Sequence, residues 1–167
     1  MPLSMYQASV KVFTRQLNNL TAILDKAAAH AEAKKIDPSV FINARLAPDM
    51  LPLAGQIQIA TDSAKGCVAR LAGIEVPSYA DTESTFPELR ERIAKTVAFL
   101  ESVTAAQLEG SDERKITLKV RGKEVDFVGR EFLLHFAHAN FYFHVTTAYA
   151  ILRHNGLEIG KQDYLGN

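Results

Sequence analysis

Residues 130–156 read REFLLHFAHANFYFHVTTAYAILRHNG, and this segment is the most informative about the fold. It predicts a helix from about Arg130 to Asn155, because basic residues suit the last turn of a helix and Gly156 suits its end. A helix that is apolar nearly all round must be covered nearly all round, so it belongs inside a bundle. Its apolar side chains leave one polar strip, which consists of His135, His138, Tyr142, Thr146 and Arg153.

One seam of a bundle cannot cover such a helix. Its second apolar side carries Phe132, Phe136 and Phe143. Either a predicted hairpin and the C-terminal tail cover this side, or a second subunit does. The sequence leaves both arrangements open and favours a homodimer.

Three further helices are expected before this one. Apolar residues recur at spacings of three and four over residues 4–35, 46–71 and 85–104, which is the period of one helix face. The third of these segments opens with Thr85 and Glu88, a pair that forms a capping box at the start of a helix. The chain therefore supplies four helices.

The connections complete the expected architecture. Residues 73–84 are polar and rich in turn formers, which predicts a long crossover at the end of the bundle. Residues 115–120 and 123–127 alternate polar and apolar side chains around a turn at Arg121-Gly122, and this pattern predicts a β-hairpin. The expected fold is all-α: a four-helix bundle with a long crossover and a small β-hairpin before the last helix, in one domain over residues 1–167.

The composition agrees with one globular domain and argues against two classes of partner, nucleic acids and membranes. The chain has 167 residues, 47% of them hydrophobic, and its 19 Lys and Arg balance 19 Asp and Glu. Zero net charge argues against nucleic acid, which is bound through basic patches. No window approaches the roughly 18 apolar residues of a membrane span, and the start of the chain lacks the pattern of a signal peptide. The single cysteine, Cys67, cannot form an internal disulfide. We expect a cytoplasmic protein that binds neither nucleic acid nor membrane.

Polar residues interrupt two of the apolar seams. In the last helix, Asn140 and His144 take positions of the seam that points inward. In the second, Gln56 lies three residues after Leu53, and Asp49 lies seven residues before Gln56, so both stand at the edge of the buried stripe. A buried amide or imidazole without a hydrogen bond costs several kcal/mol, so these groups must meet one another, water or a ligand.

Two interpretations of this pocket stay open. In one, neutral His144 binds a divalent metal, zinc or nickel, and Asn140, Gln56 or Asp49 complete or support the site. In the other, the polar groups form a satisfied network that sets the register of the helices. Transition metals ordinarily take at least three His, Cys or carboxylate ligands, and amides are poor donors, so ligand chemistry favours the network. No phosphate-binding glycine loop or Gly-x-Ser-x-Gly elbow is present.

Several segments together carry a family resemblance: LAPDMLPL at residues 46–53, NFYFH at 140–144 and LRHNG at 152–156, with the start at 3–6 and the tail at 160–166. With them the whole chain resembles the DinB/YfiT-like superfamily, and within it an uncharacterised branch, a domain-of-unknown-function family.

The resemblance implies a four-helix bundle, often dimeric, with a metal site. In the metal-binding members one histidine comes from the second helix and two, four residues apart, come from the last. The corresponding positions here are Gln56, Asn140 and His144, of which only His144 matches.

Three hypotheses follow. In the leading one, the pocket around His144, Asn140, Gln56 and Asp49 binds water or a small polar ligand in a homodimeric bundle that lacks the three-histidine site. The first alternative is a divalent-metal-dependent enzyme of the thiol transferase or hydrolase type that acts on a small molecule. The second is a homodimeric interaction module that uses the aromatic side of the last helix.

Overall fold

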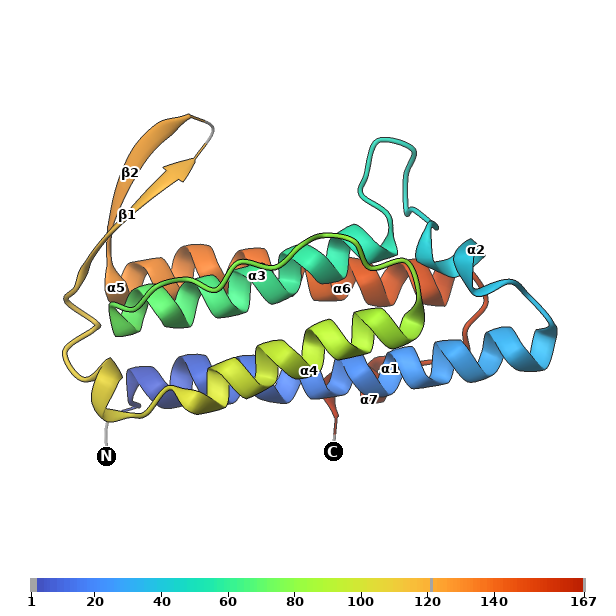
Figure 1. Cartoon of the computed structure of the whole chain (residues 1–167), viewed down its shortest axis with the longest axis horizontal. Helices are drawn as coiled ribbons and strands as arrows, with labels where there is room; N and C mark the ends of the chain where they lie inside the picture. Colours follow the sequence, from blue (N-terminus) through green and yellow to red (C-terminus); the bar gives the residue numbers. More distant parts are fainter. Residues whose placement is uncertain (1–2, 121, 167) are drawn as a thin grey trace.

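The computed structural model describes residues 3–120 and 122–166, and its long helices form a bundle. Helix α1 packs against α4 and α3 packs against α6, and further contacts of α3 with α4 and of α1 with α6 close the ring (Figure 1). The predicted four-helix bundle with a small hairpin is confirmed. The long helices are α1 (Val12–Lys34), α3 (Leu53–Ala72), α4 (Phe86–Ser102) and α6 (His138–His154).

Short elements extend or connect these helices. The π-helical segment η1 leads directly into α1, and the sequence α5, η3 and α6 is helical without a break from Gly129 to His154. The last helix therefore has almost the predicted bounds. The short elements are η1 (Gln7–Lys11), α2 (Pro38–Ile42), η2 (Ala106–Leu108), α5 (Gly129–Glu131), η3 (Phe132–Ala137) and α7 (Lys161–Leu165).

The second helix starts later than predicted. The structure begins α3 at Leu53, whereas the apolar spacing indicated a start near Leu46. Pro48 and Pro52 explain the difference, because each ring removes a backbone donor and clashes with a preceding helical turn. Pro52 has an extended backbone at the N-cap of α3, and residues 43–52 form a loop that stands out from the bundle (Figure 1).

The third helix starts as predicted. The backbone N–H of Glu88 donates to Thr85 Oγ1 at 3.3 Å, and the N–H of Thr85 donates to Glu88 Oε2 at 3.0 Å, which completes the capping box. The crossover before it takes a different course from the one predicted. It runs back along the length of α3 rather than across the end of the bundle, because α3 and α4 point in the same direction (Figure 1).

The predicted hairpin is confirmed as strands β1 (Lys115–Val120) and β2 (Lys123–Val128), which pair antiparallel. Arg121, half of the predicted turn, lies outside the described residues. The ring of Phe127 in β2 lies 5.9 Å from that of Phe132 and 5.5 Å from that of Phe136. The hairpin thus covers these two rings of the last helix, whereas Phe143 remains 55% exposed.

The tail completes the packing from the other side. Tyr164 in α7 accepts hydrogen bonds at its backbone oxygen from Gln16 Nε2 at 3.0 Å and Asn19 Nδ2 at 3.1 Å, so α7 is fastened to α1. Ile159 is buried beside it. None of the helices over residues 3–120 and 122–166 has the length and apolar character that a membrane crossing requires.

Candidate functional site

The structure brings two of the predicted site residues together across the seam between α3 and α6. The Nδ1 atom of His144 lies 2.7 Å from Oε1 of Gln56, and both side chains are buried. The Nε2 amide of Gln56 donates to the backbone oxygen of Leu51 at 3.0 Å. Gln56 and His144, which interrupt two facing seams, thus meet in the structure.

This chain of hydrogen bonds determines the protonation of His144. The Gln56 nitrogen is the donor to a carbonyl, so its oxygen must be the acceptor in the bond to the imidazole. His144 therefore carries its proton on Nδ1 and leaves a lone pair on Nε2. Burial lowers the pKa of His144, which keeps the ring neutral.

The free nitrogen keeps some contact with solvent. Over residues 3–120 and 122–166, Thr14 Oγ1 is the one fully buried side-chain polar atom that lacks a hydrogen bond. No hydrogen bond from the described residues reaches His144 Nε2, so this atom is not sealed in the core. It presents a hydrogen-bond acceptor at the edge of the seam.

Asn140 forms a second polar pair one helical turn away. Its Nδ2 donates to Oγ of Ser63 at 2.7 Å, and this pair also joins α6 to α3. Both side chains are partly exposed. Asn140 thus forms no hydrogen bond with Gln56 or His144, and the two pairs are successive links between the antiparallel helices α3 and α6.

Asp49 is not part of this cluster. The predicted position at the edge of a buried stripe required the second helix to extend back to Leu46. In the structure Asp49 is exposed in the loop of residues 43–52, before α3 begins. The proline-rich sequence of that loop separates it from the seam.

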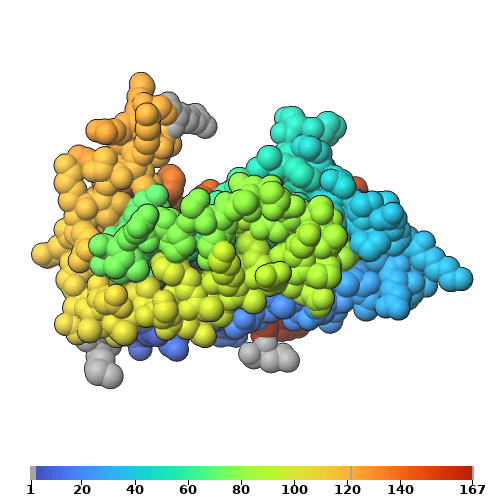
Figure 2. Space-filling model, viewed as in Figure 1, coloured from blue at the N-terminus to red at the C-terminus, as the bar shows by residue number. Residues whose placement is uncertain are grey.

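A groove beside the Asn140–Ser63 pair is large enough for a small molecule. It has a volume of ≈ 390 Å³ and lies between α3, β1 and the start of the last helix. Such a volume falls in the about 300–1,000 Å³ range of small-molecule pockets. The space-filling view shows the hairpin and the loop before α3 standing on either side of a hollow above α3 (Figure 2). Its lining includes Ile59, Ser63, Arg70, Leu118, Phe136 and Asn140.

The residues present do not fit the metal site that the superfamily implies. Gln56 and Asn140 already use their amides in hydrogen bonds, and amides are poor ligands of zinc and nickel. Within residues 3–120 and 122–166, no group of three or more His, Cys, Asp or Glu side chains is arranged to hold a metal ion. His144 would be a solitary ligand.

Cys67 and His138 could carry chemistry, but both are wholly or partly buried in the bundle. Burial raises the pKa of the Cys67 thiol, which disfavours the nucleophilic thiolate form. His138, which belongs to the polar strip of the last helix, is half-buried. Its Nε2 lies 2.8 Å from the backbone oxygen of Ala8, and burial lowers its pKa.

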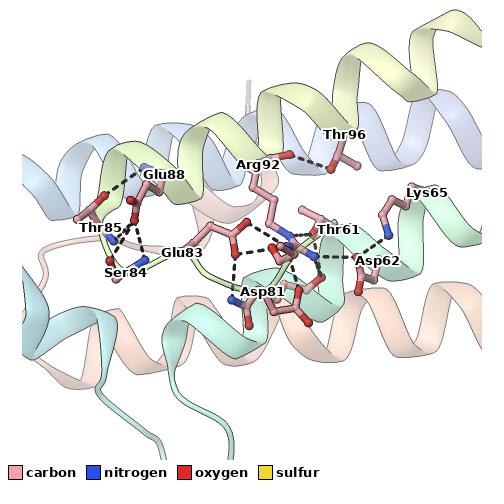
Figure 3. A network of polar contacts seen from close by, with 12 residues as sticks. Thr61, Asp62, Lys65, Asp81, Glu83, Ser84, Thr85, Glu88, Arg92 and Thr96 are labelled. Atoms are coloured by element: carbon pink, nitrogen blue, oxygen red, sulfur yellow. Dashed lines mark hydrogen bonds and ion pairs between the residues drawn. The ribbon is translucent and has the colours of Figure 1, made fainter. Parts of the chain in front are cut away.

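A charged network that the sequence analysis missed surrounds Arg92 on α4 (Figure 3). The Arg92 side chain is 1% exposed and lies 2.8 Å from Asp62, 3.0 Å from Asp81 and 3.0 Å from Glu83. Its Nε donates to Thr61 Oγ1 at 2.7 Å. The guanidinium therefore ties the crossover to both α3 and α4.

The charged groups around Arg92 already have partners within the chain, which argues for a structural role. Burial by itself raises the pKa of Glu83, but hydrogen bonds from Gln58 and Arg92 outweigh it and hold that pKa below its usual value. Asp62 also pairs with Lys65 at 2.6 Å. The sequence carried one signal of this site, since Arg92 interrupts the apolar stripe of α4, but its acidic partners lie in other elements.

The comparisons with known proteins place the fold in a family. A family model described as a domain of unknown function, DUF1993, matches residues 5–165. The chain belongs to this family. A crystal structure of a DinB family member protein from Shewanella denitrificans shares 46% sequence identity with this DUF1993 chain and has a TM-score of 0.91.

That match spans 98% of this chain and 92% of the Shewanella protein, so the likeness extends over both molecules. No curated protein matches the chain. The resemblance to an uncharacterised branch of DinB-like proteins is confirmed. The polar pairs and the groove described above are therefore features of a DUF1993 bundle.

Proposed function

We propose that this protein binds a small organic molecule in the groove between α3, β1 and the last helix, without a metal ion. The ligand reaches along the seam from the Asn140–Ser63 pair to His144. The observation that carries the proposal is the groove of ≈ 390 Å³ with the polar Asn140–Ser63 pair in its wall. The hydrogen-bonded chain from Leu51 through Gln56 adds a neutral His144 with an acceptor lone pair on Nε2, one helical turn beyond Asn140. The groove is of the size expected of a small-molecule site, and a ligand bound beside Asn140 has to extend one helical turn past the groove lining to reach His144.

Solvent mapping by NMR tests this proposal. The ¹⁵N-labelled protein is titrated with neutral probes, namely phenol, isopropanol and acetamide, and the backbone amide shifts are followed. We expect the changes to concentrate on groove residues such as Ser63, Leu118 and Asn140. Changes that concentrate instead on the pocket beside Tyr79, between the crossover and α4, would contradict the proposal.

Measurement of the zinc and nickel content of the protein distinguishes this proposal from the alternative of a divalent-metal-dependent enzyme. Protein purified without an affinity tag should contain zinc and nickel far below one ion per chain, and the His144→Ala variant should contain no less. The donor set supports this expectation, since two of the three family positions are amides engaged in hydrogen bonds. One ion per chain that is lost in His144→Ala would favour the enzyme.

A second candidate function, homodimerisation, has an observation of its own. Phe143 is 55% exposed and Leu46 is 42% exposed, and both line one apolar depression on the outer side of α6. Large apolar side chains gathered on one face are typical of protein contacts. We therefore propose that a second copy of the chain covers this face around Phe143.

A further inference from the structure

The groove is lined by more unpaired positive charge than negative charge. Arg70 and Lys119 line it, and neither forms an ion pair within the part of the chain that the structure describes. Glu124 lies opposite Lys119 in the hairpin register without pairing with it. The one acidic residue of the lining, Asp62, is already bound to Lys65 and Arg92. The groove therefore offers uncompensated positive charge, chiefly from Arg70.

The position of Arg70 depends on Gly66. The Nη1 atom of Arg70 donates to the backbone oxygen of Gly66 at 2.9 Å, so the guanidinium lies back along α3. A Cβ atom at position 66 would come within 2.6 Å of Nη1. Glycine inside a helix is less favourable than alanine, and the close approach of Arg70 explains why position 66 is nevertheless a glycine. Gly66 thus leaves the space that the guanidinium occupies.

The rest of the groove is apolar and aromatic. Phe132 and Phe136 line it from the last helix, with their ring centroids 6.0 Å apart, and Ile59 lines it from α3. An apolar wall of this kind suits the hydrocarbon body of a ligand. The polar groups of Ser63 and Asn140 lie at the same groove, towards His144.

We propose that the ligand of this groove is a small organic anion, an aromatic or aliphatic carboxylate. Its carboxylate pairs with the Arg70 guanidinium, with Lys119 as a second cation, and its apolar body packs against Phe132 and Phe136. Arginine presents a planar fork of donors that matches a carboxylate. This inference rests on the proposed function, because it names the ligand class of the same groove.

A matched pair of probes tests the charge requirement. Isothermal titration calorimetry compares 2-naphthoate with the uncharged 2-naphthamide, which has nearly the same shape. We expect naphthoate to bind at least about tenfold more tightly, since one charge-assisted hydrogen bond is worth about that factor. The Arg70→Gln variant should lose this preference. Equal binding of the two probes, or binding of neither, would overturn the proposed ligand class.

Two more variants check the geometry. Lys123→Gln removes one charge from the hairpin outside the groove lining, and it should keep the preference for naphthoate. Gly66→Ala should weaken naphthoate binding without unfolding the protein, because the added Cβ displaces only the end of a flexible side chain. A loss in Lys123→Gln equal to that in Arg70→Gln would overturn the assigned site, and unchanged binding by Gly66→Ala would overturn the placement of Arg70.

The two proposals fail separately. If the neutral solvent probes gather in the groove while naphthoate and naphthamide bind equally, the anion proposal is wrong and the small-molecule site stands. If the neutral probes gather elsewhere, the small-molecule site itself is wrong. The thermal midpoint of each variant, measured alongside, shows that a loss of binding is not a loss of fold.

Discussion

At the scale of single residues, His144 links the candidate site to the pH dependence of stability. Its pKa is lowered by burial in the folded state, whereas an unfolded histidine has a pKa of about 6.5. Below that pH the unfolded chain binds a proton that folded His144 does not, so the free energy of unfolding falls as the pH falls. His138 is shifted in the same direction and adds to the effect.

We expect the His144→Gln variant to lose less stability than the wild type between pH 7.5 and pH 5. Urea denaturation at the two pH values measures the difference. His135→Gln is the matched control, because His135 is exposed on the same continuous helix. A pH dependence that is the same in wild type and His144→Gln would contradict the account of this residue.

The sequence predicted some of the site residues for a physical reason and missed others. Gln56 and His144 interrupt regular seams, and residues on facing seams of a bundle meet. The predicted position of Asp49 was wrong, because residue spacing alone did not show that the helix begins only after Pro52. Arg92 was missed because a buried charge needs partners, and those partners lie outside α4 and far along the chain.

At the scale of elements, the Arg92 network holds the crossover onto the bundle. Replacing Arg92 by methionine leaves Glu83, whose side chain is only 13% exposed, without its cation, and we expect a loss of about 3 kcal/mol in the free energy of unfolding. Arg90→Met is the control, because Arg90 lies on the same helix as Arg92 but forms an exposed ion pair with Asp25 of α1. Its replacement should cost less than about 1 kcal/mol. Urea denaturation compares them, and equal losses would argue against the network.

The regular elements follow from local patterns, and the irregular ones depend on the assembled fold. A helical period or a strand alternation is written in neighbouring residues, so α1, α4, α6 and the hairpin could be predicted. The course of the crossover along α3 results from two helices that point the same way and from the long-range ion pairs of Arg92. No local pattern encodes that arrangement.

At the scale of the whole molecule, the exposed ring of Phe143 decides between a monomer and the proposed homodimer. The hairpin covers Phe132 and Phe136 within one chain, so Phe143 is the part of the second apolar side that is left for a partner. Phe143→Asp should convert a dimer to a folded monomer, as measured by sedimentation velocity. The control is Leu165→Asp, an exposed apolar residue on α7 outside this face. A wild type that sediments as a monomer would contradict the dimer.

We propose that the seam between α3 and α6 offers a neutral histidine to an organic ligand and not to a metal ion. Long-range ¹H–¹⁵N NMR of the His144 ring, assigned by its loss in His144→Gln, tests it most directly in untagged protein at pH 7.5. We expect a proton on Nδ1 and an unprotonated Nε2, and we expect both to stay unchanged when one equivalent of zinc is added. A proton on Nε2, or a shift of Nε2 that shows zinc coordination, would contradict it.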